Sequence, residues 1–338
     1  MAQQQASYGE PRDTRCVLLR EARLASINHL KAKFADSLGR FQGNPVAIVK
    51  VDSGGKLSHD QKQKIAREFN YSETVFLHST DGKDHRVEIF TPVSEMQFAG
   101  HPIIGTGHLL FRESSASSPE QPTSLTIMTK AGPVPVTYDW ESQIVRASVP
   151  HNIHIHQQEA ALGQICAVQA SMESASDLSE VKTTHPVVSM VKGVTYALVD
   201  LTKRHDLFSN LVPGASPQLN LDEGWAPSFT GVMYYRLLQP CTESGGDVVI
   251  WELGVRMIAI NLEDPACGSG ACSLSAYFAL SHGQLSQNHR FNIQQGSEMG
   301  RSSRIIVAVG LDEDRRRVRD IKLAGQAAIV AEGKMYVD

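Results

Sequence analysis

FAGHPIIGTG at residues 98–107 and EDPACGSGAC at residues 263–272 are two similar segments that lie far apart in this chain. Each places small residues and one or two reactive side chains at a turn, and each then continues into an apolar stretch, residues 109–111 and 274–280. A duplicated half of one active site is the simplest explanation. The alternative is two unrelated glycine-rich turns that cap two helices.

The start of a helix is a natural anion site, because its first backbone amides are unpaired and the macrodipole is positive there. Glycines in the two segments, at positions 100, 105, 268 and 270, allow the backbone to approach a ligand closely. Two such helix starts that face each other could hold a carboxylate between them.

Composition excludes several classes of protein. The 338 residues include 32 basic and 36 acidic side chains, a net charge of −4 that gives no electrostatic case for nucleic acid or an anionic membrane. No stretch approaches the about 20 apolar residues of a membrane span, and residues 1–10 are polar and lack a secretory core. Five irregularly spaced cysteines do not form a disulfide framework. We therefore expect a cytoplasmic protein without nucleic-acid or membrane partners.

Short apolar runs alternate with turn residues from about residue 29 onward, as is typical of strands. Residues 58–69 are predicted to form a helix with Ser58 as N-cap, and residues 114–122 a surface loop. Residues 157–180 include apolar positions at helical spacing, and a further helix is expected over 273–280. Strands are expected at 46–51, 74–78, 86–90, 125–128, 134–138, 144–149, 195–199, 232–237, 248–252, 304–309, 321–323 and 328–331.

This pattern predicts an α+β fold with two similar halves, each a curved sheet around a helix. We expect an N-terminal extension over residues 1–28, a first half over 29–150 and a second half over 151–338. The last strand could pair with strands of the first half.

Common cofactor motifs are absent from the sequence. Cys267 stands where a nucleophile elbow needs glycine, Ser273 stands where a dinucleotide fingerprint needs glycine, and no phosphate loop occurs. His151, His154 and His156 could place imidazoles on one strand face, but no acidic cluster surrounds them in the sequence, and Cys267 and Cys272 do not follow zinc spacing. The sequence predicts neither a metal nor an organic cofactor.

A set of groups suited to proton transfer remains. Glu73 enters an apolar strand, where desolvation is expected to raise its pKa into a useful acid/base range. His101 and Asp264 occupy matching turns and could hold a polar group of a substrate, although N-cap and turn roles are the alternatives. Cys267 at a helix start is expected to have a lowered pKa and could act as an opposing base, with a buried structural thiol as the alternative.

Several motifs occur in one order along residues 29–333: GNP at 43–45, SETVF at 72–76, IFTP at 89–92, GHP at 100–102 with Gly105-Thr106, EDPACGS at 263–269, and QGSE at 295–298 with Gly300-Arg301. On these residues the chain resembles the PhzF-like (phenazine biosynthesis) family, which has the diaminopimelate epimerase fold. The resemblance implies two facing halves with the site in the cleft between them, no cofactor, and a homodimer.

The same resemblance implies an isomerase that shifts a proton on a small, usually carboxylate-bearing molecule. It assigns the acid/base to Glu73 and substrate orientation to His101 and Asp264. Ser269 matches a family serine, and Gly100 and Gly268 match backbone donors.

The chain departs from the family pattern around residues 251–272. Cys267 replaces a common threonine, and residues 266–272 resemble one half of the two-thiol epimerases, but the first half has no matching cysteine. Residues 251–261 lack the usual Arg-x-Phe-x-Pro pattern. Three alternatives to the isomerase therefore remain: an epimerase or racemase that uses Glu73 and Cys267 on opposite faces, a lyase or hydratase, and a non-catalytic binding protein on the same fold.

Overall fold

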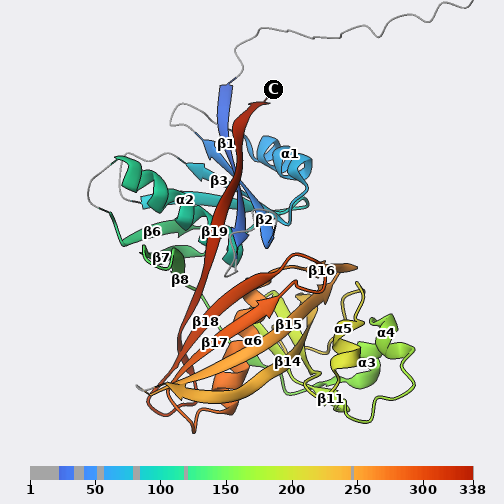
Figure 1. Cartoon of the computed structure of the whole chain (residues 1–338). Helices are drawn as coiled ribbons and strands as arrows, with labels where there is room; N and C mark the ends of the chain where they lie inside the picture. Colours follow the sequence, from blue (N-terminus) through green and yellow to red (C-terminus); the bar gives the residue numbers. More distant parts are fainter. Residues whose placement is uncertain are drawn as a thin grey trace, which may run out of the picture.

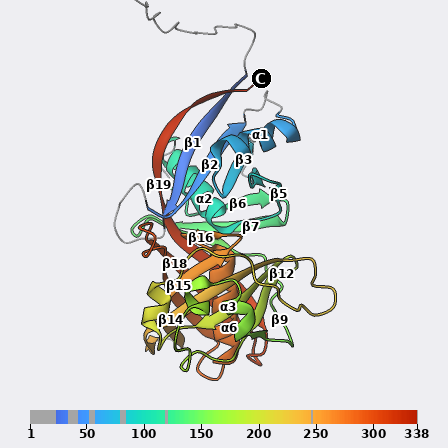
Figure 2. The ribbon, with the colours of Figure 1, turned by 90° about the vertical axis from the view of Figure 1, so that its right-hand side faces the viewer.

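The computed structural model describes residues 23–33, 42–51, 57–78, 84–117, 121–244 and 247–337. Its strands form one continuous 17-stranded sheet and a separate two-stranded sheet within these residues. Two curved halves lie one above the other, and each wraps around one long helix, α2 (Gly100–Ser117) or α6 (Gly268–Ser281) (Figures 1 and 2). The predicted α+β class with two similar halves is confirmed.

The N-terminal half runs from β1 to β8. Its elements besides α2 are β1 (Arg23–Lys33), β2 (Asn44–Val51), α1 (His59–Phe69), β3 (Glu73–His78), β4 (Asp84–Phe90), β5 (Glu95–Met96), β6 (Ser124–Thr129), β7 (Gly132–Asp139) and β8 (Ile144–Ser148). α1 begins as predicted, because Ser58 and Gln61 form a capping box. β1 begins at Arg23, ahead of residue 29, where the sequence places the start of this half.

The C-terminal half holds the remaining elements. They are β9 (His154–Ile155), β10 (Ala160–Ala161), α3 (Leu162–Cys166), α4 (Ala170–Glu173), β11 (Thr184–His185), β12 (Val187–Val191), β13 (Val194–Asp200), α5 (His205–Ser209), β14 (Phe229–Ser244), β15 (Val248–Ala259), β16 (Leu262–Asp264), β17 (Asn288–Gln295), β18 (Ser303–Leu311) and β19 (Val318–Val337).

Strand pairing repeats between the halves. β2 and β3 are parallel, β4 forms a short hairpin with β5, and α2 then crosses over to β6, which is parallel to β4. In the same order, β13 and β14 are parallel, β15 forms a hairpin with β16, and α6 crosses over to β17, which is parallel to β15. The two glycine-rich segments therefore start equivalent helices.

β19 joins the two halves. It pairs with β18, then with β8, and finally with β1 along the outer edge of the first half, so it runs through both halves in Figure 1. The sequence predicts closing strands at 321–323 and 328–331; both segments lie in β19, and only the predicted break between them is wrong. The residues between them stay extended because β8 and β1 supply their backbone partners.

Other boundaries also differ from the sequence prediction. α2 continues to Ser117, into the predicted loop at 114–122, because a helix nucleated on its buried residues propagates cheaply by one bond per residue. The sequence analysis did not predict β12 or β17. β12 is buried on both faces, and β17 consists mostly of polar residues although many of its positions are buried. No helix among the described residues is long and apolar enough to cross a membrane.

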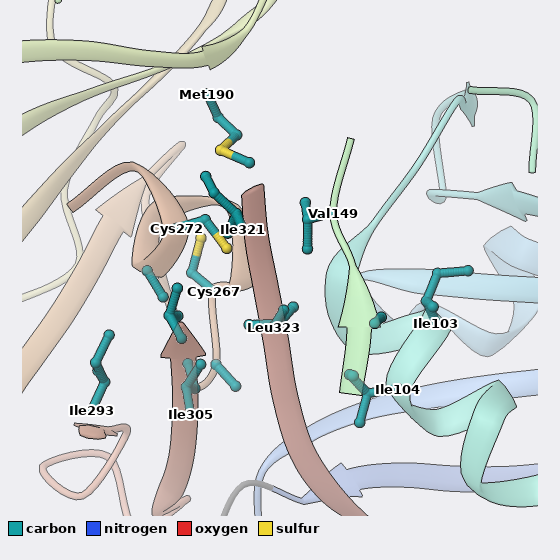
Figure 3. Packing of buried hydrophobic residues seen from close by; sticks show 14 of the residues in the cluster. Ile103, Ile104, Val149, Met190, Cys267, Cys272, Ile293, Ile305, Ile321 and Leu323 are labelled. Atoms are coloured by element: carbon teal, nitrogen blue, oxygen red, sulfur yellow. The ribbon is translucent and has the colours of Figure 1, made fainter. Parts of the chain in front are cut away.

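Leu323 of β19 packs where the two long helices begin. It is buried and lies between Cys267 and Cys272 on one side and the α2 residues Ile103 and Ile104 on the other (Figure 3). A Cβ atom at Gly100 would lie 2.6 Å from its Cδ2 atom, and a Cβ atom at Gly268 would lie 3.0 Å from it. This side chain therefore fills the space over both helix starts.

Replacing Leu323 by alanine is expected to lower the free energy of unfolding by about 2 to 5 kcal/mol, because the change removes buried methyl groups and leaves a cavity. Urea denaturation measures this loss. Leu262→Ala is the matched control, since Leu262 is 62 % exposed and its truncation should change stability by about 0.5 kcal/mol or less. Equal effects of the two substitutions would contradict this account of Leu323.

Candidate active site

A cavity of about 520 Å³ lies where the two halves meet. Its wall is largely apolar, with Met96, Phe98, Val149, Met190 and Leu323 among the lining residues. Its polar lining includes Glu73, His101, Asp264 and Ser269, so the structure brings the four predicted polar side chains to one cavity. Lys192, in the turn between β12 and β13, contributes a positive charge to the wall.

The starts of α2 and α6 touch at this cavity. A Cβ atom on Gly100 would lie 3.5 Å from the Cα atom of Gly268, and one on Gly268 would lie 3.4 Å from the Cα atom of Gly100. Two sets of first-turn amides, one from each half, therefore meet at the cavity. Their dipoles favour a negative charge on a bound molecule.

Glu73 is the first residue of β3, and its side chain is 15 % exposed. Burial raises its pKa to about 7, the direction that the sequence predicts, while the hydroxyl group of Ser72 lowers it by a smaller amount. Its Oε2 atom lies 3.2 Å from Nε2 of His101. Neither atom has a hydrogen-bond partner in the part of the chain that the structure describes. A carboxyl group with this pKa exchanges its proton readily near neutral pH.

His101 lies in the first turn of α2 and is buried. Burial lowers its pKa to about 4, although Asp264 and a hydrogen bond to the Pro45 carbonyl act in the opposite direction. The imidazole is therefore neutral at pH 7. Since the Pro45 carbonyl only accepts, the ring nitrogen bonded to it carries the proton. The unpartnered Nε2 atom is left with a lone pair that faces Glu73.

Asp264 is the last residue of β16, so it belongs to the C-terminal half, whereas Glu73 belongs to the N-terminal half. Its Oδ1 atom accepts hydrogen bonds from the Ala266 amide at 2.7 Å and from Nδ2 of Asn44 at 3.0 Å. Burial raises its pKa to about 6, and Glu73 adds to this rise, while His101 opposes it. Asp264 is thus an acceptor held in place from both halves.

Asn44 and Gln295 support this arrangement. The Asn44 Oδ1 atom accepts from the Ser72 hydroxyl, so one amide connects the residue before Glu73 with Asp264. Gln295 donates to the Asp264 carbonyl and accepts from the Cys267 amide. Sequence reasoning did not assign roles to these two amides, although both belong to the GNP and QGSE motifs.

Cys267 is the N-cap of α6, and its Sγ atom accepts from the Gly270 amide at 3.3 Å. Burial raises the pKa of this thiol to about 12, so the predicted lowering is wrong. The loss of hydration on burial outweighs the helix-start amide that lowers the pKa. Cys267 is therefore a neutral thiol.

Tyr196, which the sequence analysis missed, contacts the start of α6. Its hydroxyl group is 2.6 Å from Ser269 Oγ and 3.4 Å from Cys267 Sγ. Burial raises its pKa well above the usual value, so it stays a neutral hydrogen-bonding group. It fixes the orientation of Ser269 at the cavity.

The sequence matches a known protein family and several known proteins. The profile of the family described as phenazine biosynthesis-like protein, PhzC-PhzF, matches residues 32–227 and 256–333, which is most of the chain. The antisense-enhancing sequence 1 protein of Schizosaccharomyces pombe is 29 % identical over 314 residues, covering 88 % of this chain and 95 % of the relative. The trans-2,3-dihydro-3-hydroxyanthranilate isomerase of Pseudomonas aeruginosa is 29 % identical over 302 residues, with the same coverage.

Among solved structures, a PhzF-family phenazine biosynthesis protein of Bacillus anthracis superposes with a TM-score of 0.69 and 21 % identity. The superposition covers 93 % of this chain and all of the other. At this identity the likeness supports the fold, and the fold agrees with the family match. The chain belongs to the phenazine biosynthesis-like (PhzC-PhzF) family and is an isomerase.

Proposed function

We propose that the protein is a cofactor-independent isomerase that moves a proton between two carbon atoms of a small carboxylate-bearing metabolite, with Glu73 as the general acid/base. The observation that carries this proposal is the position of Glu73. Its carboxyl group lines the cavity beside two helix starts and has a pKa of about 7, so it can both accept and return a proton.

The proposed reaction consists of two proton transfers. Ionised Glu73 removes a proton from a carbon atom next to an unsaturated or carbonyl group, and the electron pair is delocalised over the substrate. The first-turn amides at Gly100 and Gly268 stabilise the developing negative charge. Protonated Glu73 then returns the proton to a second carbon atom, so the double bond moves and no atom is gained or lost.

His101 and Asp264 orient the substrate. The lone pair on neutral His101 Nε2 can accept a hydrogen bond from protonated Glu73 or from a substrate hydroxyl or amino group. Asp264 offers a further acceptor in the cavity wall, and Ser269 offers a hydroxyl group held by Tyr196. These groups favour a substrate that carries a hydrogen-bond donor near its reacting carbon atom.

The lining of the cavity is complementary to a compact, largely apolar molecule with an anionic end. Methionine, phenylalanine and leucine side chains line it, whereas the helix starts and Lys192 supply positive potential. The Pseudomonas aeruginosa relative is named for a dihydro-hydroxyanthranilate, which is a cyclic carboxylate. We propose a substrate of that general class.

An epimerase with Cys267 as the second base is less well supported. Such a base must lose its proton near neutral pH, and burial holds the Cys267 thiol protonated. The pKa values of Glu73 and Cys267 therefore differ too much for the two groups to act as paired bases of similar strength.

Replacing Glu73 by glutamine is expected to reduce deuterium incorporation from heavy water into small unsaturated or 2-amino carboxylates by about 10² to 10⁴-fold, because the amide cannot carry the proton. Mass spectrometry of the recovered substrate measures the exchange. Glu141→Gln, at an exposed position, is the matched control and should exchange as wild type does. Unchanged exchange in Glu73→Gln would rule out Glu73 as the base.

The same substitution is expected to stabilise the fold at pH 8. Folded Glu73 has a pKa of about 7 against an ordinary value of 4.5, so the folded state binds more protons between these values and the wild type loses stability as pH rises through them. Glu73→Gln escapes this loss and should gain up to about 3 kcal/mol at pH 8, with little gain at pH 4.5. Urea denaturation at the two pH values provides the comparison, and a gain that is independent of pH would argue against a buried, titrating Glu73.

Cys267→Ala is expected to leave deuterium exchange within about tenfold of wild type, because the thiol is neutral and serves as an N-cap. The same mass-spectrometric assay, run beside Glu73→Gln, decides between the two bases. Exchange that survives Glu73→Gln and disappears in Cys267→Ala would transfer the role of base to the thiol.

A further inference from the structure

A cluster of His154, His156 and Asp222 lies outside the cavity described above. One ligand atom from each of the three residues lies within 4.8 Å of the others. The sequence predicts no metal, because no acidic cluster surrounds these histidines in the chain. The structure removes that reason, since the long loop between α5 and β14 brings Asp222 against them.

The two histidines project from one side of an extended segment. β9 pairs with β12, and the His156 amide continues this pairing by donating to the Val187 carbonyl. Residues two apart on a strand share a face, and the His154 and His156 rings are 4.7 Å apart, nearly perpendicular. A His-x-His pair on a strand thus presents two nitrogen atoms to Asp222.

Hydrogen bonds determine which nitrogen atom of His156 carries the proton. Ser228 donates to the Phe229 carbonyl, which only accepts, so Thr195 must donate to Ser228 and Ser189 to Thr195. His156 Nε2 therefore donates to Ser189 at 2.8 Å. The Nδ1 atom, on the side of Asp222, is left with a lone pair. Metal-bound histidines typically donate their other ring N–H in this way.

The spacing of the ligand atoms suits a small transition-metal ion. His154 Nε2 and His156 Nδ1 lie 2.7 Å and 3.8 Å from Asp222 Oδ2. Ligand atoms about 2.1 Å from a tetrahedral zinc ion lie about 3.4 Å apart, a value between these two. The side chains of His154 and Asp222 are 32 % and 23 % exposed, so solvent reaches the cluster and water can supply a fourth ligand.

We propose that His154, His156 and Asp222 form a site for a divalent transition metal of the zinc type, which fastens the loop between α5 and β14 to β9. Binding replaces two hydrogen bonds, the one between His154 and Asp222 and the one from the Asp222 amide to His156 Nδ1. The bound ion holds the same three residues by stronger bonds. This site is independent of the proton-transfer reaction.

The loop is suited to such an attachment. Residues 210–228 lie between α5 and β14 without regular secondary structure. Long structureless segments in compact domains generally need specific anchors. Trp225 of the same loop stacks on the His154 ring, with ring centroids 4.4 Å apart and an interplanar angle of 10°. The loop therefore contacts the cluster through Trp225 as well as through Asp222.

Zinc and cobalt titrations of the tag-free, metal-stripped full chain test the proposal. We expect one equivalent of Zn²⁺ by calorimetry, a rise in melting temperature that a chelator reverses, and the visible absorption of tetrahedral Co²⁺ when cobalt replaces zinc. His154→Ala and Asp222→Asn should each weaken Zn²⁺ binding at least tenfold and remove the cobalt absorption.

Two controls separate this site from others. His151→Ala removes a neighbouring histidine that bonds to the Val149 carbonyl and should bind zinc as wild type does. Glu73→Gln should also bind zinc normally, because its site is separate. Absence of saturable binding in the wild type would overturn the proposal. Binding that is unchanged in both His154→Ala and Asp222→Asn would do so as well.

Discussion

The contact between Gly100 and Gly268 is the constraint on which the rest of the structure depends. The two helix starts lie so close together that an added Cβ atom on either glycine would already be in van der Waals contact with the opposite Cα atom, at 3.4 or 3.5 Å, and would crowd the Cδ2 atom of Leu323. The repeated strand order brings one helix start from each half to this place, and β19 holds the halves together across it. Close approach concentrates two sets of first-turn amides at a largely apolar cavity, where their electrostatic effect is strong.

Desolvation then assigns different states to the ionisable groups at this site. The same burial that keeps His101 neutral and Cys267 protonated brings the pKa of Glu73 to about 7. Of these three groups, only Glu73 changes its charge near neutral pH. Asp264, with a pKa of about 6, is steadied by the Ala266 amide and by Asn44. A site of this kind sacrifices some stability to keep a reactive carboxyl group out of water.

Polar side chains hold the segments around the site together, and Asn44 and Arg301 do so between the two halves. Asn44 bonds to Ser72 and Asp264, and Gln295 bonds to the backbone on both sides of Pro265. Arg301 donates twice to the Gly43 carbonyl, which ties the turn after β17 to the start of β2. These contacts explain why the GNP and QGSE motifs accompany the acidic residues in the sequence, although they carry no proton chemistry. They tie Asp264 to Ser72, the residue before Glu73, through the Asn44 side chain.

The sequence alone determined the duplicated turns and the α+β class, and it singled out Glu73, His101 and Asp264 as candidates, because local spacing and glycine placement are readable without a fold. It also indicated the direction of the Glu73 pKa, since a carboxylate in an apolar strand is desolvated. Only the tertiary structure decided the pKa of Cys267, because a helix start lowers a thiol pKa whereas burial raises it, and the balance depends on neighbours distant in sequence. The tertiary structure also decided three further features: the single strand β19, the contact of Tyr196 with Ser269, and the approach of Asp222 to His154. Each depends on partners supplied by remote segments, and no local pattern encodes them.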